Sequence, residues 1–188
     1  QIRVRILDYA PAKIDNSFFE TRIHASIKRR QNETTEEFSG RLIFSESDLL
    51  PGLILDAYAG HFVVQYLCAG MEFRRNEINE ILFAHPACKT LYERSDSASR
   101  GSEGLGARSG SISEVAAPDL IKISEHGTMF YVDIRKGHKT GFYLDQNHNR
   151  NLLKSYSKGR NVLNCFSYTG GFGLSALAGE AKSLTNID

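Results

Sequence analysis

Residues 162–188 read VLNCFSYTGGFGLSALAGEAKSLTNID, and the order of elements in them indicates the fold class. An apolar strand at 160–166 leads into a glycine-rich turn, and a helix of small residues follows at 171–178. A second strand at 182–188 ends on the acid Asp188. A buried strand, a glycine turn, a helix and a second strand in this order open an α/β nucleotide-binding sheet.

The glycine turn and Asp188 together predict a cofactor that carries an adenosine group. Glycines let a ligand approach the backbone, the helix N-terminus offers N–H groups, and an acid about 20 residues on can bind ribose hydroxyls. No third glycine follows Gly171 and Gly173, and Phe172 occupies space that a pyrophosphate needs. This favours S-adenosylmethionine over NAD. Two alternatives stay open: an NAD-dependent oxidoreductase fragment, and small residues that only pack a helix on a sheet.

The composition is that of an ordinary globular protein. The chain has 188 residues, 41% of them hydrophobic, and a net charge of +1. That is enough for one domain or two small ones, and it gives no overall attraction to nucleic acid or membrane. The longest apolar runs are well short of the ~18 residues of a membrane span. Three cysteines fit no zinc pattern, so we expect no metal and reduced, mostly buried thiols in a cytosolic protein.

The upstream sequence predicts a mixture of helices and strands. Alternation of Ile2, Val4 and Ile6 with polar residues indicates a half-buried strand. Ser17 and Glu20 form the pattern of a capping box, and we expect a helix from there to about Arg30. The remaining expectations are a strand at 41–44, a hairpin at 53–68, a helix at 71–85, a strand at 88–93, a long loop at 95–117, a hairpin at 120–134 and a helix at 145–158.

Two long motifs carry a resemblance to a known family. The first is GHKTGFYLDQ at 137–146, followed by Asn149 and Arg150, and the second is VLNCFSYTGGFG at 162–173. Together they resemble the PUA-linked ribosomal RNA methyltransferases. Shorter matches to the family's middle domain lie upstream: the ESD and LPGL segments within 46–53, YERSD at 92–96 and EHG at 125–127.

The resemblance implies an α+β middle domain followed by the first βαβ part of a Rossmann-like α/β methyltransferase domain. Residues 1–8 would be the last strand of a PUA-like domain, and residues 9–136 the middle domain. Residues 137–188 would be the start of the S-adenosylmethionine-dependent methyltransferase domain. Because the chain also opens on Gln1, we expect segments to be missing at both ends.

The family forms 5-methylcytosine in large-subunit ribosomal RNA, by adding a cysteine thiolate to carbon-6 of the base. The matching cysteine is expected beyond Asp188, so no catalytic residue is assigned and the chain alone is expected to be inactive. Cys165 is interpreted as a buried core thiol, and His138 and His148 as loop or surface histidines rather than bases. The resemblance, with the chemistry of the turn, gives the expected cofactor residues: Gln146, Arg150, Phe166, Ser167, Tyr168, Thr169, Gly170, Gly171, Phe172 and Asp188.

RNA contacts are expected from Arg94, Arg100, Lys136 and Lys139, which would flank the cleft of the family layout. The alternative for each is solvated surface charge. The expected partner is large-subunit ribosomal RNA in the cytoplasm, with no membrane contact, and a homodimer is a further expectation. A non-catalytic RNA-binding or assembly module stays open as an alternative function.

Overall fold

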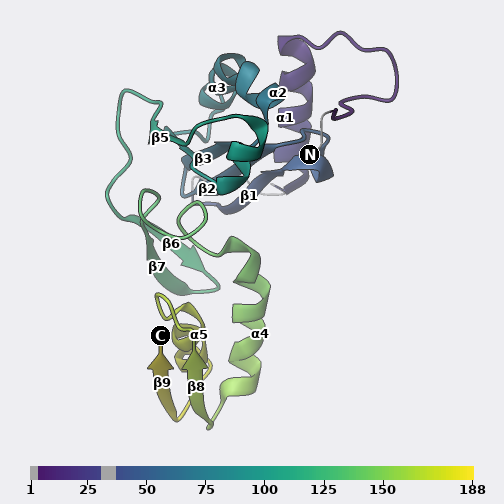
Figure 1. Ribbon diagram of the computed structural model, residues 1–188. Coiled ribbons are helices and arrows are strands. Elements are labelled where there is room, and N and C mark those ends of the chain that lie inside the picture. Colours follow the sequence, from purple (N-terminus) through teal and green to yellow (C-terminus); the bar gives the residue numbers. More distant parts are fainter. Residues whose placement is uncertain (1–3, 31–36) are drawn as a thin grey trace.

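The computed structural model describes residues 4–30 and 37–188 and contains three sheets (Figure 1). The helices are α1 (Asn16–Arg30), α2 (Ala69–Phe73), α3 (Arg75–Phe83), α4 (Asn147–Ser157) and α5 (Gly171–Ala178), with 3₁₀ turns η1 (Ser45–Asp48), η2 (Ala98–Glu103) and η3 (Leu144–Gln146). The strands are β1 (Ser39–Phe44), β2 (Leu53–Tyr58), β3 (His61–Tyr66), β4 (Thr90–Ser95), β5 (Arg108–Ser111), β6 (Ile121–Glu125), β7 (Thr128–Val132), β8 (Asn161–Cys165) and β9 (Ser183–Ile187).

The larger part is a five-stranded sheet in the order β1-β2-β3-β4-β5. Its strands pair antiparallel except for β3 and β4, which are parallel and are joined through α2 and α3. Helix α1 buries Phe19, Ile23 and Ile27 in the core of this part. Their four-residue spacing, seen in the sequence, is therefore the apolar stripe of an amphipathic helix.

The cap of α1 differs from the predicted one. Asp15, not Ser17, accepts the hydrogen bond from the backbone N–H of Phe18, at 3.2 Å, and Ser17 Oγ donates to the same carboxylate. The hydroxyl of Ser17, then Lys13 and the Phe18 N–H, lower the pKa of Asp15 to about 2. A carboxylate is the better acceptor, so the acid two residues earlier replaces Ser17 as the cap.

The strand expected at 1–8 is not formed in its described portion, since residues 4–8 belong to no strand. The start of that prediction, 1–3, lies outside the described residues. Val4 and Ile6, expected to face a core, are 80% and 62% exposed. Leu7 packs against the core instead, and Arg5 pairs with Glu103 at 2.7 Å. The alternation of apolar and polar residues alone did not determine which face of this segment packs against the core.

Two further segments differ from expectation. The serine- and glycine-rich segment 95–117 is not a plain loop, because η2 lies in it and β5 pairs with β4. The single helix expected at 71–85 is two helices, α2 and α3, that meet at Arg74. Backbone pairing to a neighbouring strand gives β5 its conformation despite weak local propensity.

The smaller part holds the hairpin β6–β7, helix α4 and a β8–α5–β9 unit. In Figure 1 the hairpin lies between the five-stranded sheet and the β8–α5–β9 unit, with α4 along one side. Strands β8 and β9 are parallel, as the sequence order predicts. The hairpin core joins the five-stranded sheet through Tyr58 and Val63. The hairpin is thus one physical link between the two parts.

Strand β8 was expected to be buried, and this is wrong for the described chain. Its residues alternate between exposed and half-buried, and Cys165 is exposed rather than a core thiol. Cys68 is buried and Cys88 half-buried, and all three are free. Within the described ranges, no helix combines the length and the apolar character needed to cross a membrane.

Close packing of α5 on α4 depends on Gly179. A Cβ at this position would lie 2.4 Å from Lys154 O and 2.6 Å from Lys154 Cα, both backbone atoms. Gly179→Ala is therefore expected to lower the free energy of unfolding by about 1–3 kcal/mol, measured by urea denaturation. Gly101→Ala is the control, because nothing lies within 4 Å of its added Cβ. Equal stability of the two variants would contradict this packing.

Candidate functional site

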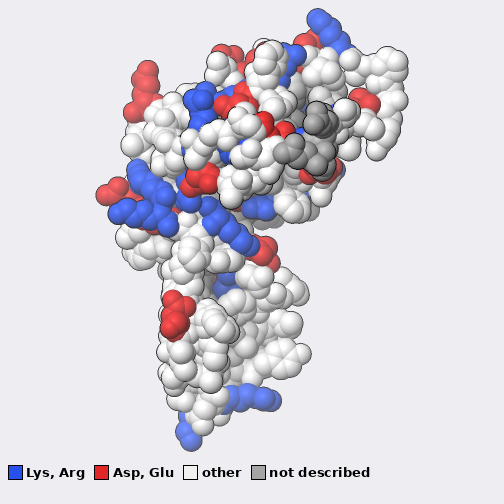
Figure 2. All heavy atoms as spheres, in the orientation of Figure 1, with Lys and Arg blue, Asp and Glu red and all other residues white. Residues whose placement is uncertain are grey.

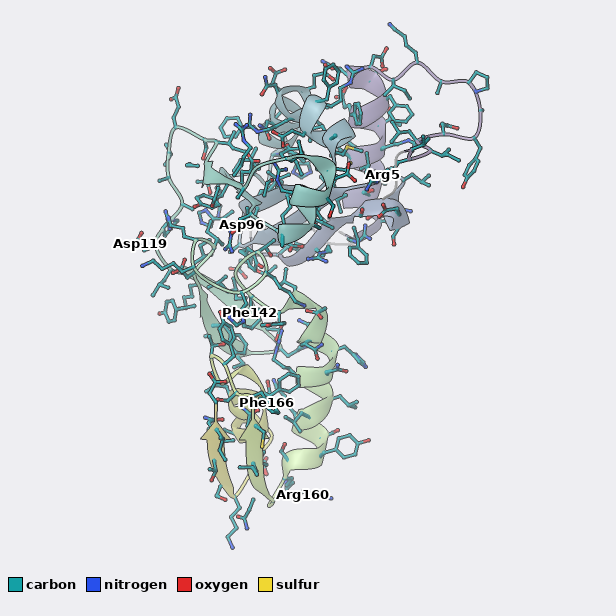
Figure 3. All side chains as sticks on the ribbon, viewed as in Figure 1. Arg5, Asp96, Asp119, Phe142, Arg160 and Phe166 are labelled. Atoms are coloured by element: carbon teal, nitrogen blue, oxygen red, sulfur yellow. The ribbon has the colours of Figure 1, made fainter. Side chains whose placement is uncertain are left out.

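A cavity of about 420 Å³ lies between the glycine turn and the start of α4. Its size is within the ~300–1,000 Å³ range of small-molecule sites. Figure 3 shows Phe142 and Phe166 toward the carboxyl end of β8, while Arg160 lies at the strand's opposite end. The lining residues are His138, Phe142, Tyr143, Gln146, Arg150, Phe166, Ser167, Tyr168, Thr169, Gly171, Phe172 and Asp188.

The glycine turn is held in shape by backbone hydrogen bonds. Ser167 N donates to Ile187 O at 3.1 Å, and Gly170 N donates to Ser167 O at 2.8 Å. Gly170 caps α5 with a φ of 77°, a conformation that glycine adopts without strain. Phe166 and Tyr168 also have positive φ values, 57° and 48°. Non-glycine residues in this region are uncommon, and their concentration here marks a tightly specified turn.

Asp188 closes the turn from the end of β9. Its Oδ1 accepts a hydrogen bond from Tyr168 N at 2.9 Å, so the acid and the turn are directly linked. The carboxylate lines the cavity. Because a carboxylate has two oxygens with several acceptor sites, Asp188 can hold the turn and still accept from a ligand hydroxyl.

Arg150 is buried at the side of the cavity and is paired with Glu125. Arg150 is 3% exposed; its Nε lies 2.5 Å from Glu125 Oε2 and its Nη2 lies 2.7 Å from Glu125 Oε1. Nη2 also donates to the carbonyl of Tyr143. The guanidinium lies 4.5 Å from the ring centre of Phe142, and Phe130 is also near. Its charge is compensated inside the protein, so Arg150 shapes the cavity wall rather than presenting a free cation.

Three aromatic rings form another side of the cavity. The ring of His138 stacks on Tyr168, with centroids 4.2 Å apart and planes 13° apart. Tyr143 meets both rings edge-on, and its hydroxyl lies 3.1 Å from His138 Nδ1. With Phe166 and Phe172 these rings supply flat apolar faces, which suit a flat heterocycle such as adenine.

The structure brings together every expected cofactor residue around this cavity except Gly170, which caps α5 and is not among the lining residues. Sequence reasoning missed Phe142, Tyr143 and Glu125, and it interpreted His138 as an ordinary loop histidine. The first two and His138 lie within the long 137–146 motif, which was a signal for them. Glu125 lies on β6, and only the fold places it against Arg150.

Two of the expected RNA contacts are wrong. Arg94 is 7% exposed and donates to the carbonyl of Ile134 at 2.7 Å and to Gly137 O. Arg100 is 2% exposed and donates to the carbonyls of Tyr66 and Gly106 and to Glu72. Both guanidinium groups satisfy backbone oxygens inside the protein, which leaves them unavailable to phosphates.

Lys136 and Lys139 are exposed, as an RNA contact requires. Lys139 Nζ pairs with Asp145 at 2.8 Å. Burial would raise the pKa of Asp145, but the hydrogen bond and charge of Lys139 outweigh it and the pKa is lowered. Figure 2 shows basic side chains gathered where the two parts of the molecule meet. The described residues contain no cluster of His, Cys, Asp and Glu suited to a metal ion.

Residues 109–188 match the family model of S-adenosylmethionine-dependent methyltransferases. This part of the chain is similar to that methyltransferase family. The match starts at β5 and includes the β6–β7 hairpin, the whole cavity and Asp188. It begins well before the boundary expected at residue 137. Glu125 is therefore within the methyltransferase match, together with the Arg150 that it pairs.

The whole chain is similar to ribosomal RNA large subunit methyltransferase I of several bacteria. It is 45% identical over 193 residues to that of Tolumonas auensis, covering 100% of this chain and 48% of the relative. It is 44% identical over 191 residues to that of Vibrio parahaemolyticus, with the same coverage of both chains. The chain thus spans about half the length of the curated relatives it matches.

Solved methyltransferase structures have a similar fold. A chain from Streptococcus mutans assigned as a SAM-dependent methyltransferase has a TM-score of 0.84 and 25% identity, covering 97% of this chain and 47% of its own. A second, assigned as a methyltransferase and complexed with SAH, has a TM-score of 0.82 and 26% identity, with coverage of 95% and 46%. The cofactor expected from the glycine turn is confirmed as that of the family.

Proposed function

We propose that the chain carries the cofactor site of an enzyme that methylates large-subunit ribosomal RNA and forms 5-methylcytosine. The observation that carries the proposal is the cavity, which joins the glycine turn, Asp188 and the wall formed by Arg150. The similarity of the whole chain to ribosomal RNA large subunit methyltransferases supports the RNA substrate. The cytosine-5 product follows from the motif resemblance of residues 137–150 and 162–173.

The residues around the cavity fit S-adenosylmethionine chemically. Asp188 would accept hydrogen bonds from the ribose hydroxyls, and the turn at 166–172 would bind the methionine end. The aromatic cluster would cover the adenine. When bound, the cofactor supplies an electrophilic methyl group. The chain's own residues bind and orient it. The titratable groups of the described lining are Asp188, His138, Tyr143 and Tyr168, beside the paired Arg150.

The thiolate that this chemistry needs is not supplied by the cavity. No cysteine is among the lining residues. Cys68 is buried in the core of the five-stranded part, and burial raises the pKa of Cys88 to about 12. Cys165 is exposed on β8 and does not line the cavity. We therefore propose that the 188-residue chain binds cofactor without transferring methyl groups.

The division into a middle domain at 9–136 and the start of a Rossmann-like domain at 137–188 remains part of the proposal. The separate five-stranded sheet and the parallel β8–α5–β9 unit support it. Lys136 and Lys139, exposed on the loop between β7 and α4, stay the proposed RNA contacts. The proposed partner is large-subunit ribosomal RNA, and the proposed location is the cytoplasm. The proposed assembly is a homodimer.

Calorimetric titration of S-adenosylhomocysteine into the chain tests the cofactor site, with NAD as the control. We expect binding of S-adenosylhomocysteine and none of NAD, because Phe172 occupies space that a pyrophosphate needs. Radiolabelled methyl transfer to ribosomal RNA by the same chain is expected to be absent. Tight NAD binding would contradict the cofactor assignment, and methyl incorporation would contradict the assignment of the nucleophile outside this chain.

A further inference from the structure

The loop from Ile134 to Thr140 is fastened to the five-stranded sheet by buried side chains. Thr140 is 1% exposed, and its Oγ1 donates to Asp56 Oδ2 at 2.6 Å. The same oxygen lies 2.7 Å from the hydroxyl of Tyr58. A threonine hydroxyl has one proton, and here it goes to the carboxylate. Tyr58 is therefore the donor to Thr140.

The groups around Thr140 form a satisfied network within β1 and β2. Arg41 donates to both oxygens of Asp56, at 2.8 and 3.0 Å, and Asp56 is fully buried. Burial and then the charge of Asp56 raise the pKa of Tyr58, so its hydroxyl keeps the proton that it donates. Buried networks with every partner in place are rigid, and losing one member is costly.

Arg94 holds the other end of the same loop. Its Nη1 donates to Ile134 O at 2.7 Å and to Gly137 O at 3.3 Å. The loop is tightly closed around Gly137, where a Cβ would lie 2.5 Å from the carbonyl oxygens of both Asp133 and Gly141. Strand β4 therefore holds the start of the loop, while β2 holds its end.

His138 lies between these two anchors and forms part of the cavity wall. Its ring stacks on Tyr168 of the glycine turn, and its backbone N–H donates to the Tyr168 hydroxyl at 3.0 Å. A continuous set of contacts thus runs from Asp56 through Thr140 and the loop to His138 and Tyr168. The five-stranded sheet, which contributes no residue to the cavity lining, can fix the position of the cavity wall.

We propose that Asp56, Tyr58 and Thr140 are positioning residues that set the cofactor cavity from the five-stranded sheet, through the stack of His138 on Tyr168. The effect on ligand affinity rests on the proposed function, in which this cavity binds S-adenosylmethionine. The effect on the His138 stack does not, because it concerns the ligand-free protein.

Two variants of the network test the inference, and each has a matched control variant. Thr140→Val removes the hydroxyl, whereas Thr140→Ser keeps it. Tyr58→Phe removes the phenol that contacts Thr140. Tyr66→Phe is its control, because Tyr66 is equally buried and its hydroxyl donates to Asn79, away from the loop. Both phenylalanine variants lose one buried hydroxyl and its hydrogen bonds, so their thermal unfolding should change by a similar amount.

The first readout is the NMR resonance of the His138 ring protons in the ligand-free chain. Stacking on Tyr168 shifts these protons by ring current. We expect Thr140→Val and Tyr58→Phe to move the resonance toward that of an unstacked histidine. Thr140→Ser and Tyr66→Phe should leave it in place. An unmoved His138 resonance in Thr140→Val, or an equal movement in Tyr66→Phe, would overturn the inference.

The second readout is the affinity for S-adenosylhomocysteine, measured by calorimetry. We expect Thr140→Val to weaken binding about tenfold, a typical size for coupling between linked sites, and Tyr66→Phe to bind as the unmodified chain does. A Thr140→Val variant with a displaced His138 but full affinity would overturn the positioning role. If the unmodified chain fails to bind, the proposed cofactor function fails, while the His138 resonance still decides whether the sheet positions the wall.

Discussion

Replacing Glu125 by leucine is expected to lower the free energy of unfolding by about 3–5 kcal/mol, because it leaves a buried arginine without its counter-ion. Arg150 is 3% exposed and Glu125 is 7% exposed, so water cannot replace the lost carboxylate. The guanidinium would have to move toward the cavity to be solvated, and we expect binding of S-adenosylhomocysteine to be lost with it. Urea denaturation and calorimetry measure the two effects.

The double variant Glu125→Leu with Arg150→Leu distinguishes two causes of lost stability. One is the unpaired buried charge of Arg150, and the other is the lost packing of the side chains. Removing both members of a buried pair is often tolerated, so the double variant should regain much of the stability that the single variant loses. Lys158→Gln is the control, since Lys158 pairs with Glu180 at the surface and both side chains are mostly exposed. Its effect should stay within about 0.5 kcal/mol. A fully stable Glu125→Leu variant would contradict this account of the pair.

Replacing Asp188 by alanine is expected to weaken binding of S-adenosylhomocysteine by about ten- to a hundredfold. Two losses combine: the ribose hydroxyls lose a charged acceptor, worth about 1.5–3 kcal/mol, and Tyr168 N loses its partner in the turn. Because the turn has positive φ at Tyr168, losing that hydrogen bond should also let the turn relax. Calorimetry of the variant against the unmodified chain measures the change.

Asp188→Asn tests the role of charge, because its side-chain oxygen can still accept from Tyr168 N. Its affinity should fall between those of the alanine variant and the unmodified chain. Asp119→Ala is the matched control, since the Asp119 side chain is fully exposed and lies outside the cavity lining. Equal affinities for Asp188→Ala and Asp119→Ala would show that the acid at the end of β9 does not bind the cofactor.

The local sequence pattern was sufficient to predict most helices and strands and the glycine turn at the centre of the site. The spacing of Phe19, Ile23 and Ile27 predicted α1, and turn residues separated the strands of both hairpins. The glycine turn predicted the β8–α5–β9 order and its parallel pairing. These signals survive because helix period, strand period and turn geometry depend on neighbours in the sequence. The expected cofactor residues were close in sequence to that turn or to the motif before α4.

Tertiary structure alone decided which charged groups are buried and what they contact. Arg94 and Arg100 look like surface cations in the sequence, but Arg94 donates to the carbonyl of Ile134 and Arg100 to that of Tyr66, both distant in the sequence. Glu125 became a site residue only because the hairpin packs beside α4. Strand formation also depended on a neighbouring strand. Residues 4–8 belong to no strand although their alternation predicts one, whereas β5 pairs with β4 within a glycine-rich segment. A buried polar group needs a hydrogen-bond partner, and the sequence shows which groups are polar. Only the folded chain decides which residue becomes that partner.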